Sequence, residues 1–324
     1  MLHSDNYSLD TCVSVCLTEQ MTTISPAAHN LAQLADPEVG PLDGLIDLDR
    51  YPLDQPGSPA WKKLVLDVRG QLDENGSACL AGFLTSEALG NAATEVAAIA
   101  RHVPIREHSG SVYARTDLEA ELDAGDPRRA RLAWNAGHVT RDMFPPYSPA
   151  HRLYVSACFK AFIASVVGQE RVFEYADPLA GLVATVLPPE GQYPWHYDTN
   201  EYVVTIMTQQ PESGGVFEYH RDLRSPGDEN LGGLGSVLAG EPDAPARSLD
   251  IVPGDLQLFL GRYSLHQVTK VIGDVDRHVL VLSYAERPGV IGPVDRTRSV
   301  YGRITEAHLL AEQTRLADND GLIL

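Results

Sequence analysis

GRYSLHQVTKVIGDVDRHVLVLSYAE, residues 261–286, places two short runs of β-forming residues on either side of a Gly-Asp turn. Apolar and polar residues alternate along the first run, and the second run is rich in Val and Leu. Such runs of four to eight residues, bounded by turn residues, are typical of strands with a buried face. The segment therefore predicts two neighbouring strands of a β-rich core.

Runs of the same kind recur from about residue 172 onward, at 181–189, 201–209, 214–220 and 248–261. Short strands at regular spacing predict a sandwich or barrel with Greek-key connections. The stretch 224–248 is rich in Gly, Pro and Asp, and we expect a long connection there, either an active-site rim or a mobile loop.

The residues before this β region predict helices. Residues 58–76 combine a Ser-Pro start, apolar residues at helical spacing and an Asn-Gly stop. Apolar residues also favour helices at 86–103 and 151–168, and a short buried strand at 77–85. The fold class is thus α+β with a mainly β core.

The domain organisation follows from these patterns. Residues 1–40 have little periodic pattern and predict a flexible N-terminal extension. We expect one domain over 41–324, with helical support at about 58–170, a β core at about 172–290 and a C-terminal segment at 291–324 that contains a helix at 305–314.

Composition excludes several classes of partner. The chain has 44 acidic and 25 basic residues and a net charge of −19, which opposes binding to nucleic acid or to a membrane surface. It contains no run of about 18 apolar residues, and its first thirty residues lack a secretory signal, so we expect a cytoplasmic protein. The four cysteines form no CxxC pair, which disfavours a disulfide framework or a zinc knuckle. Oligomeric state is left open.

Three residues have the types and spacing of a metal site. His196 and Asp198 lie two apart in YPWHYDTNEYVV, so in an extended segment their side chains point to the same side. The same His-x-Asp spacing occurs at 3–5 and 220–222, and spacing alone therefore does not decide. His266, in a distant strand, supplies a third ligand. Two histidines and one carboxylate form the ligand set of non-haem Fe(II) oxygenases.

Arg277 lies eleven residues after His266 and begins the next predicted strand. On that strand Arg277, Val279, Val281 and Ser283 share one face, so a guanidinium and a hydroxyl can both point into the barrel. An arginine binds a carboxylate through two parallel hydrogen bonds, and a buried arginine requires an anion as partner.

The order HYD at 196–198, then His266, then Arg277, resembles the pattern of the Fe(II)/2-oxoglutarate-dependent dioxygenases. A narrower resemblance, over about 190–305, is to the free-amino-acid halogenases related to the lysine chlorinase and to their hydroxylase relatives. HYDTNEYVV, GGVFEY, PGDLQLFLGRYSLHQVT, RHVLVLSYAERPGV and RTRSVYGR carry this resemblance, over roughly a third of the chain. The halogenases replace the carboxylate ligand by a small residue, so Asp198 disfavours halogenation.

The resemblance implies a double-stranded β-helix, a cupin-like jelly-roll flanked by N-terminal helices. It implies Fe(II) held by His196, Asp198 and His266, with 2-oxoglutarate and O2 as co-substrates, Arg277 and Ser283 at the co-substrate, and ascorbate as a supporting reductant. The implied reaction is oxidation of an unactivated C–H bond of a small amino acid, free and lysine-like or modified, in natural-product metabolism. Hydroxylation is the default outcome, and desaturation or ring closure, such as cyclopropane formation, stays open.

Five residues are candidates for binding the amino acid. Arg131 and Arg298 are candidates for a carboxylate clamp, although either could be a solvated surface charge. Thr199 and Asn200 follow the ligand turn and either face the cavity or brace the turn. Tyr301 is either an aromatic wall or a core residue.

The competing hypothesis is a non-catalytic, cupin-like protein that binds a metal or another ligand. Arg277 discriminates between the two, because a simple metal or sugar binder does not require a buried guanidinium beyond the last metal ligand.

Overall fold

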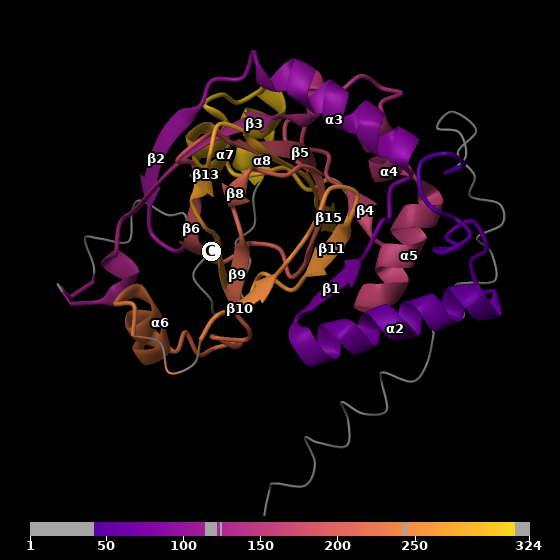
Figure 1. Ribbon diagram of the computed structural model, residues 1–324. Helices are drawn as coiled ribbons and strands as arrows, with labels where there is room; N and C mark the ends of the chain where they lie inside the picture. Colours follow the sequence, from indigo (N-terminus) through magenta and orange to yellow (C-terminus); the bar gives the residue numbers. More distant parts are fainter. Residues whose placement is uncertain (1–41, 114–121, 124, 242, 244, 315–324) are drawn as a thin grey trace, which may run out of the picture.

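The structure, a computed structural model, describes residues 42–113, 122–123, 125–241, 243 and 245–314. The predicted N-terminal extension, residues 1–40, lies outside these residues. Within them, two antiparallel sheets form the core, and helices lie outside it (Figure 1).

The larger sheet has seven strands in the order β1-β11-β7-β14-β5-β3-β2, and every neighbouring pair is antiparallel. β14 lies at its centre between β5 and β7, which explains the nearly continuous apolar sequence of this strand. The strands are β1 (Ser77–Leu80), β2 (Arg106–Gly110), β3 (Leu132–Val139), β5 (Leu182–Leu187), β7 (Val203–Gln209), β11 (Leu256–Phe259) and β14 (Arg277–Leu282).

The smaller sheet has four strands in the order β10-β9-β12-β6. They are β6 (Tyr193–His196), β9 (Phe217–His220), β10 (Arg247–Leu249) and β12 (Leu265–Val268). Two short ribbons complete the β structure: β8 (Ser213–Gly214) pairs with β13 (Val271–Ile272), and β4 (Phe173–Glu174) pairs with β15 (Tyr284–Ala285).

Aromatic side chains join the two sheets face to face. The ring of Phe259, on β11, lies 4.9 Å from that of Phe217 and 5.3 Å from that of Tyr219, both on β9. In chain order, β5, β7, β11 and β14 belong to the larger sheet, whereas β6, β9, β10 and β12 belong to the smaller one. The chain therefore passes back and forth between the sheets, as in a jelly-roll, and the predicted fold class is confirmed.

Four helices cover the larger sheet on its outer side (Figure 1). They are α2 (Pro59–Asn75), α3 (Ser86–Ala100), α4 (Pro149–Val155) and α5 (Ala157–Val167). The caps of α2 agree with the sequence prediction: the Ser58 hydroxyl accepts a hydrogen bond from the Trp61 backbone N–H, and Gly76 ends the helix with a φ of 71°.

The prediction of one helix over 151–168 is wrong. Ser156 ends α4, and its hydroxyl caps α5 by accepting from the Phe159 backbone N–H. Serine competes in this way with the helical backbone, and the two helices meet at a bend of 57°. No single helix in the described ranges has both the length and the apolar composition of a membrane span. Taken together, α4 and α5 have that length and composition, but they are bent at their junction.

Other segments contain more regular structure than predicted. β2 and β3 lie within the range 58–170, where we expected helical support, and α6 (Leu231–Leu238) lies within the expected connection 224–248. α6 is rich in glycine, and it is stabilised because Leu234 and Val237 are buried in a hydrophobic cluster beside the smaller sheet. The 3-10 helices are η3 (Pro127–Arg129) and η4 (Arg141–Met143).

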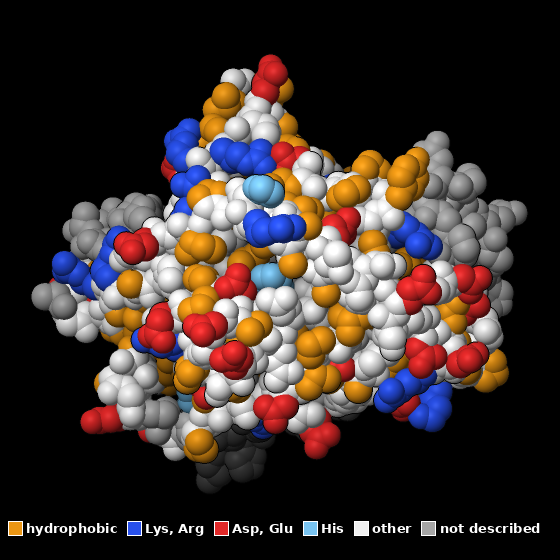
Figure 2. Space-filling view, turned by 45° about the horizontal axis from the view of Figure 1, so that its top comes forward, with side chains coloured by type: hydrophobic (Ala, Val, Ile, Leu, Met, Phe, Trp, Pro, Cys, Tyr) orange, Lys and Arg blue, Asp and Glu red, His pale blue; other side chains and the backbone are white. Residues whose placement is uncertain are grey.

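The C-terminal segment forms α7 (Val294–Tyr301) and α8 (Glu306–Thr314). α8 confirms the helix predicted at 305–314, whereas α7 was not predicted. The acidic residues that give the chain its negative net charge are spread among basic and apolar side chains on the molecular face shown in Figure 2.

Candidate metal centre

Two adjacent strands of the smaller sheet bring the predicted histidines together. His196 on β6 and His266 on β12 are cross-strand partners, with ring centroids 4.1 Å apart. Asp198 follows β6, and its Oδ2 lies 3.6 Å from Nε2 of His266. One ligand atom from each of the three residues lies within 4.8 Å of the others. The structure thus assembles all three predicted ligands at one point.

Backbone carbonyls set the orientation of both imidazoles. Nδ1 of His196 donates to the Pro194 carbonyl at 2.7 Å, and Nδ1 of His266 donates to the Ser264 carbonyl at 3.0 Å. Because a carbonyl only accepts, each Nδ1 carries a proton, which leaves Nε2 as the nitrogen available to a metal. Burial, helped by the neighbouring His266, lowers the pKa of His196 to about 3, so this imidazole is neutral at pH 7.

The Asp198 carboxylate is incomplete without a cation. Its Oδ2 is buried and accepts no hydrogen bond from any described residue. An ionised oxygen buried in this way is costly unless a positive charge lies beside it. Two imidazoles and one such carboxylate fit a ferrous ion, which accepts mixed nitrogen and oxygen donors.

Gly261 leaves the space in which this carboxylate lies. The Asp198 backbone N–H donates to the Gly261 carbonyl at 3.1 Å, so the two segments are adjacent. A Cβ on Gly261 would overlap the Asp198 carboxylate. The turn after β11 thus depends on glycine for a steric reason.

Two arginines that the sequence analysis missed brace the ligand loop. The guanidinium of Arg224, whose residue is 2% exposed, lies 3.9 Å from the ring centroid of Tyr197, between the two ligands of the loop. Arg224 also donates to Glu229 at 3.2 Å and to the Arg262 carbonyl at 2.8 Å. Arg262 in turn donates to the Thr199 carbonyl at 2.5 Å. Nothing in the spacing of these residues indicates that they are buried.

Arg277 occupies the predicted position between the sheets. Val279 and Val281, on the same face of β14, pack against Met207 in the barrel interior. Arg277 is 5% exposed, and burial lowers its pKa to about 10. Its Nε has no hydrogen-bond partner, and no carboxylate among the described residues forms an ion pair with it. A buried, unpaired guanidinium is suited to an incoming anion.

Aromatic rings lead outward from the metal centre. The Tyr193 ring lies 5.3 Å from that of His196, and its hydroxyl is 3.1 Å from Nε2 of His138. Tyr301, on α7, meets the His138 ring edge-on at 5.6 Å. Burial lowers the pKa of His138 to about 3 and raises that of Tyr193 to about 12. This wall is neutral at pH 7.

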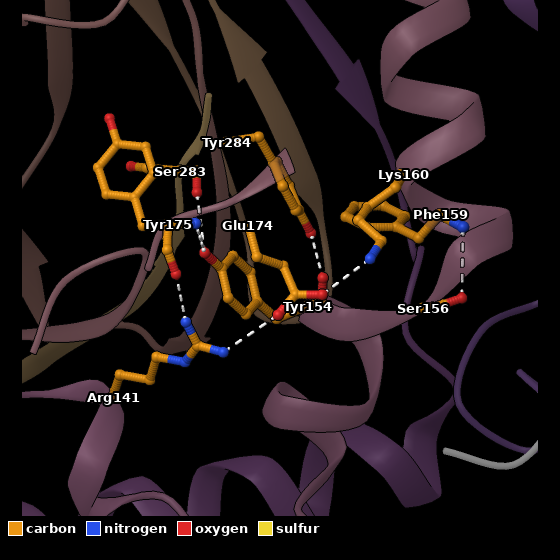
Figure 3. A network of polar contacts seen from close by, with 9 residues as sticks. All are labelled: Arg141, Tyr154, Ser156, Phe159, Lys160, Glu174, Tyr175, Ser283 and Tyr284. Atoms are coloured by element: carbon orange, nitrogen blue, oxygen red, sulfur yellow. Dashed lines mark hydrogen bonds and ion pairs between the residues drawn. The ribbon is translucent and has the colours of Figure 1, made fainter. Parts of the chain in front are cut away.

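A second wall is formed by Tyr175, whose hydroxyl donates to Oδ1 of Asn200 at 2.5 Å. Figure 3 shows how the Tyr175 backbone is held on both sides: its N–H donates to the Tyr154 hydroxyl at 3.0 Å, and its carbonyl accepts from Arg141 at 2.6 Å. The Tyr154 hydroxyl donates to the Ser283 carbonyl at 3.2 Å. The phenol of Tyr175 is therefore attached to a rigid backbone.

The remaining predicted site residues are placed as follows. Asn200 and Tyr301 belong to the two walls, and Thr199 braces the ligand loop through its carbonyl. Ser283 makes its described hydrogen bonds through its backbone, so its predicted role at the co-substrate stays a prediction. Arg131 is exposed and donates to the Ser109 carbonyl, and Arg298 is exposed on α7.

No protein-family model and no curated sequence matches this chain. Among solved structures it is similar to an oxidoreductase of the 2OG-Fe(II) oxygenase family from Burkholderia pseudomallei, with 16% identity over 70% of this chain and 92% of that chain and a TM-score of 0.43. A prolyl-4-hydroxylase from Pseudomonas putida matches with 14% identity over 69% and 99% of the two chains and a TM-score of 0.43.

The epimerase SnoN from nogalamycin biosynthesis, described as non-heme and alpha-ketoglutarate dependent, matches with 12% identity over 69% and 83% of the two chains and a TM-score of 0.46. These similarities are too low to transfer an activity or a site residue. The function is therefore argued from the side chains of this chain.

Proposed function

We propose that the protein is an Fe(II)- and 2-oxoglutarate-dependent oxygenase. The unpaired Asp198 oxygen beside two correctly oriented histidines carries the proposal. His196, Asp198 and His266 would hold the iron, and Arg277 would bind the far carboxylate of 2-oxoglutarate. When bound, the iron with 2-oxoglutarate and O2 supplies the oxidising power needed to attack an unactivated C–H bond.

The chain's own residues prepare the site for this chemistry. The backbone carbonyls of Pro194 and Ser264 keep both histidines in the tautomer that binds metal. The apolar side chains of Met207, Val279 and Val281 exclude water from the barrel interior next to Arg277, which strengthens an ion pair formed there.

The proposed substrate is a small amino acid, free and lysine-like or modified, and the default outcome is hydroxylation. This part rests on the sequence resemblance over 190–305. Desaturation and ring closure differ from hydroxylation only in the fate of the substrate after hydrogen removal, so they stay open. A non-catalytic cupin-like binder is disfavoured because it gives no role to the unpaired guanidinium of Arg277.

The first test is the visible charge-transfer band of the chelate, measured without oxygen after adding Fe(II) and 2-oxoglutarate. We expect the band in the wild type and its loss in His266→Ala and Asp198→Ala. His220→Ala is the matched control, because His220 belongs to the His-x-Asp triplet at 220–222 and lies on β9, the strand next to β12. A wild-type protein without the band, or a control that loses it equally, contradicts the proposal.

The second test identifies the reaction. Amino acids are screened for stimulation of succinate formation, and the product of each active one is analysed by mass spectrometry. A gain of one oxygen indicates hydroxylation, and a loss of two hydrogens indicates desaturation or ring closure.

A further inference from the structure

Helix α7 has one face turned toward the protein and one toward solvent. Its partly or fully buried residues are spaced as expected for one helical face. They are Val294, Arg296, Thr297, Val300 and Tyr301. The exposed residues are Asp295, Arg298 and Ser299. The arginine predicted as a clamp, Arg298, therefore lies on the outer face, whereas Arg296 lies on the inner one.

The inner face of α7 is next to the metal centre. Tyr301 packs on His138, which contacts Tyr193, which in turn packs beside the ligand His196. These contacts place the buried face of α7 on the aromatic wall, outward from the metal ligands.

A buried polar cluster fixes the segment that carries α7. The fully buried carboxylate of Asp177 accepts from the Gly292 backbone N–H at 2.8 Å, just before α7. It also contacts Nε2 of the fully buried His308, on α8, at 3.0 Å. Because both flanks of α7 are held by the same carboxylate, its inner face is fixed relative to the core.

Arg296 is half-buried and has no ion-pair or hydrogen-bond partner among the described residues. Burial raises the pKa of Tyr175, Tyr193 and Tyr301, and the positive charge of Arg296 opposes this rise. Arg296 therefore lies on the inner face of α7, close enough to both aromatic walls to act on their phenols, and forms no ion pair with a carboxylate of the described residues.

We propose that Arg296 binds the carboxylate of the organic substrate, on the inner face of α7 and beside the Tyr175–Asn200 pair. That the bound molecule is a substrate rests on the proposed oxygenase function. The presence of an anion-binding subsite at Arg296 does not depend on that function. A molecule with a carboxylate at one end would be held by Arg296, with its other end directed toward His196. This subsite is separate from Arg277, which lies between the sheets.

Binding to the metal-free protein tests the subsite without turnover. The probes are the twenty common L-amino acids, first pooled in ligand-observed NMR and then titrated singly by calorimetry, together with the carboxamide of each one that binds. The variants are Arg296→Gln, Arg296→Lys and the control Arg298→Gln, which removes the exposed arginine of the same helix.

We expect at least one amino acid to bind the wild type, and its carboxamide to bind on the order of tenfold to a hundredfold more weakly, because a charge-assisted pair is lost. Arg296→Gln should weaken the amino acid by a similar factor and leave the carboxamide unchanged. Arg296→Lys should restore part of the affinity, and Arg298→Gln should match the wild type.

Three results would overturn the inference: no amino acid binds the wild type, amino acid and carboxamide bind equally, or Arg296→Gln binds the amino acid as the wild type does. The comparison with the carboxamide uses only wild-type protein, so it holds even if a variant fails to fold. If the wild type lacks the charge-transfer band yet binds the amino acid through Arg296, the proposed oxygenase function is contradicted and the proposed subsite is supported.

Discussion

Replacing Gly261 by alanine tests whether the position of the Asp198 carboxylate sets the affinity of the metal centre. Gly261 is not among the glycines with positive φ, so alanine can adopt its backbone conformation. The only obstacle is steric, because the new Cβ would point at Asp198.

The size of the displacement follows from the structure. The added Cβ would lie 2.7 Å from Cγ of Asp198 and 3.0 Å from its Cβ, whereas ordinary contact begins at 3.4 Å. Cγ must therefore retreat by roughly 0.7 Å (3.4 − 2.7), and Oδ2, which is closer still, by more. Metal-ligand distances tolerate about 0.2 Å.

We expect Gly261→Ala to weaken metal binding by about tenfold to a hundredfold, the range seen when the support of a ligand is removed. Titration with Co(II), followed by its visible absorption, measures this affinity without oxidation of the metal. Gly70→Ala is the control, because Gly70 lies exposed within α2 with nothing within 4 Å of a new Cβ. It should leave Co(II) binding unchanged and raise the free energy of unfolding by about 0.5–1 kcal/mol.

A double-mutant cycle separates this cause from a general distortion. In Asp198→Ala there is no carboxylate to displace, so adding Gly261→Ala should cause no further loss of Co(II) affinity. Wild-type affinity in the single variant Gly261→Ala, or an equal further loss in the Asp198→Ala background, would refute the steric argument.

Three more expectations concern buried ionisable groups. Arg277→Met should raise the 2-oxoglutarate concentration needed for the charge-transfer band on the order of a hundredfold. In urea denaturation, the ligand-free variant should be no less stable than the wild type, because an unpaired buried charge is removed. A loss of several kcal/mol in the free energy of unfolding would indicate that Arg277 already has a partner. Arg224→Met should instead lower the free energy of unfolding by about 3–5 kcal/mol, because the partly buried Glu229 loses an ion pair; near-wild-type stability would contradict the bracing role. The pKa of His138 is about 3 in the folded protein and about 6.5 when unfolded, so the unfolded chain binds the proton first and stability falls as pH falls through this window. His138→Gln should reduce that slope by up to ~1.4 kcal/mol per pH unit, measured by urea denaturation between pH 4 and 6, and an unchanged slope would be inconsistent with a neutral buried His138.

The sequence predicted those features that depend on neighbouring residues. The Ser-Pro start and Asn-Gly stop of α2 were recognisable because capping uses hydrogen bonds within a few residues. Most strands of the core were recognisable from their alternating or apolar runs. The ligand pair of His196 and Asp198 is likewise local, whereas its partnership with His266 was inferred from ligand chemistry and from resemblance.

Features that depend on long-range packing were not predictable. α6 is a poor helix by composition and forms because Leu234 and Val237 are buried against a distant part of the chain. The burial of Arg224 depends on Tyr197 and Glu229, which come from separate segments.

The two arginines of α7 illustrate the same division. By itself, the sequence determined that a His-x-Asp pair, a distant histidine and a following arginine stand at suitable positions along β-forming segments. It could not determine which of Arg296 and Arg298 lies on the inner face of α7, because α7 itself was not predicted and the orientation of a helix depends on the surface it packs against. Only the tertiary structure, through Tyr301 on His138 and Asp177 at both flanks of the helix, decided that Arg296 is the inward one.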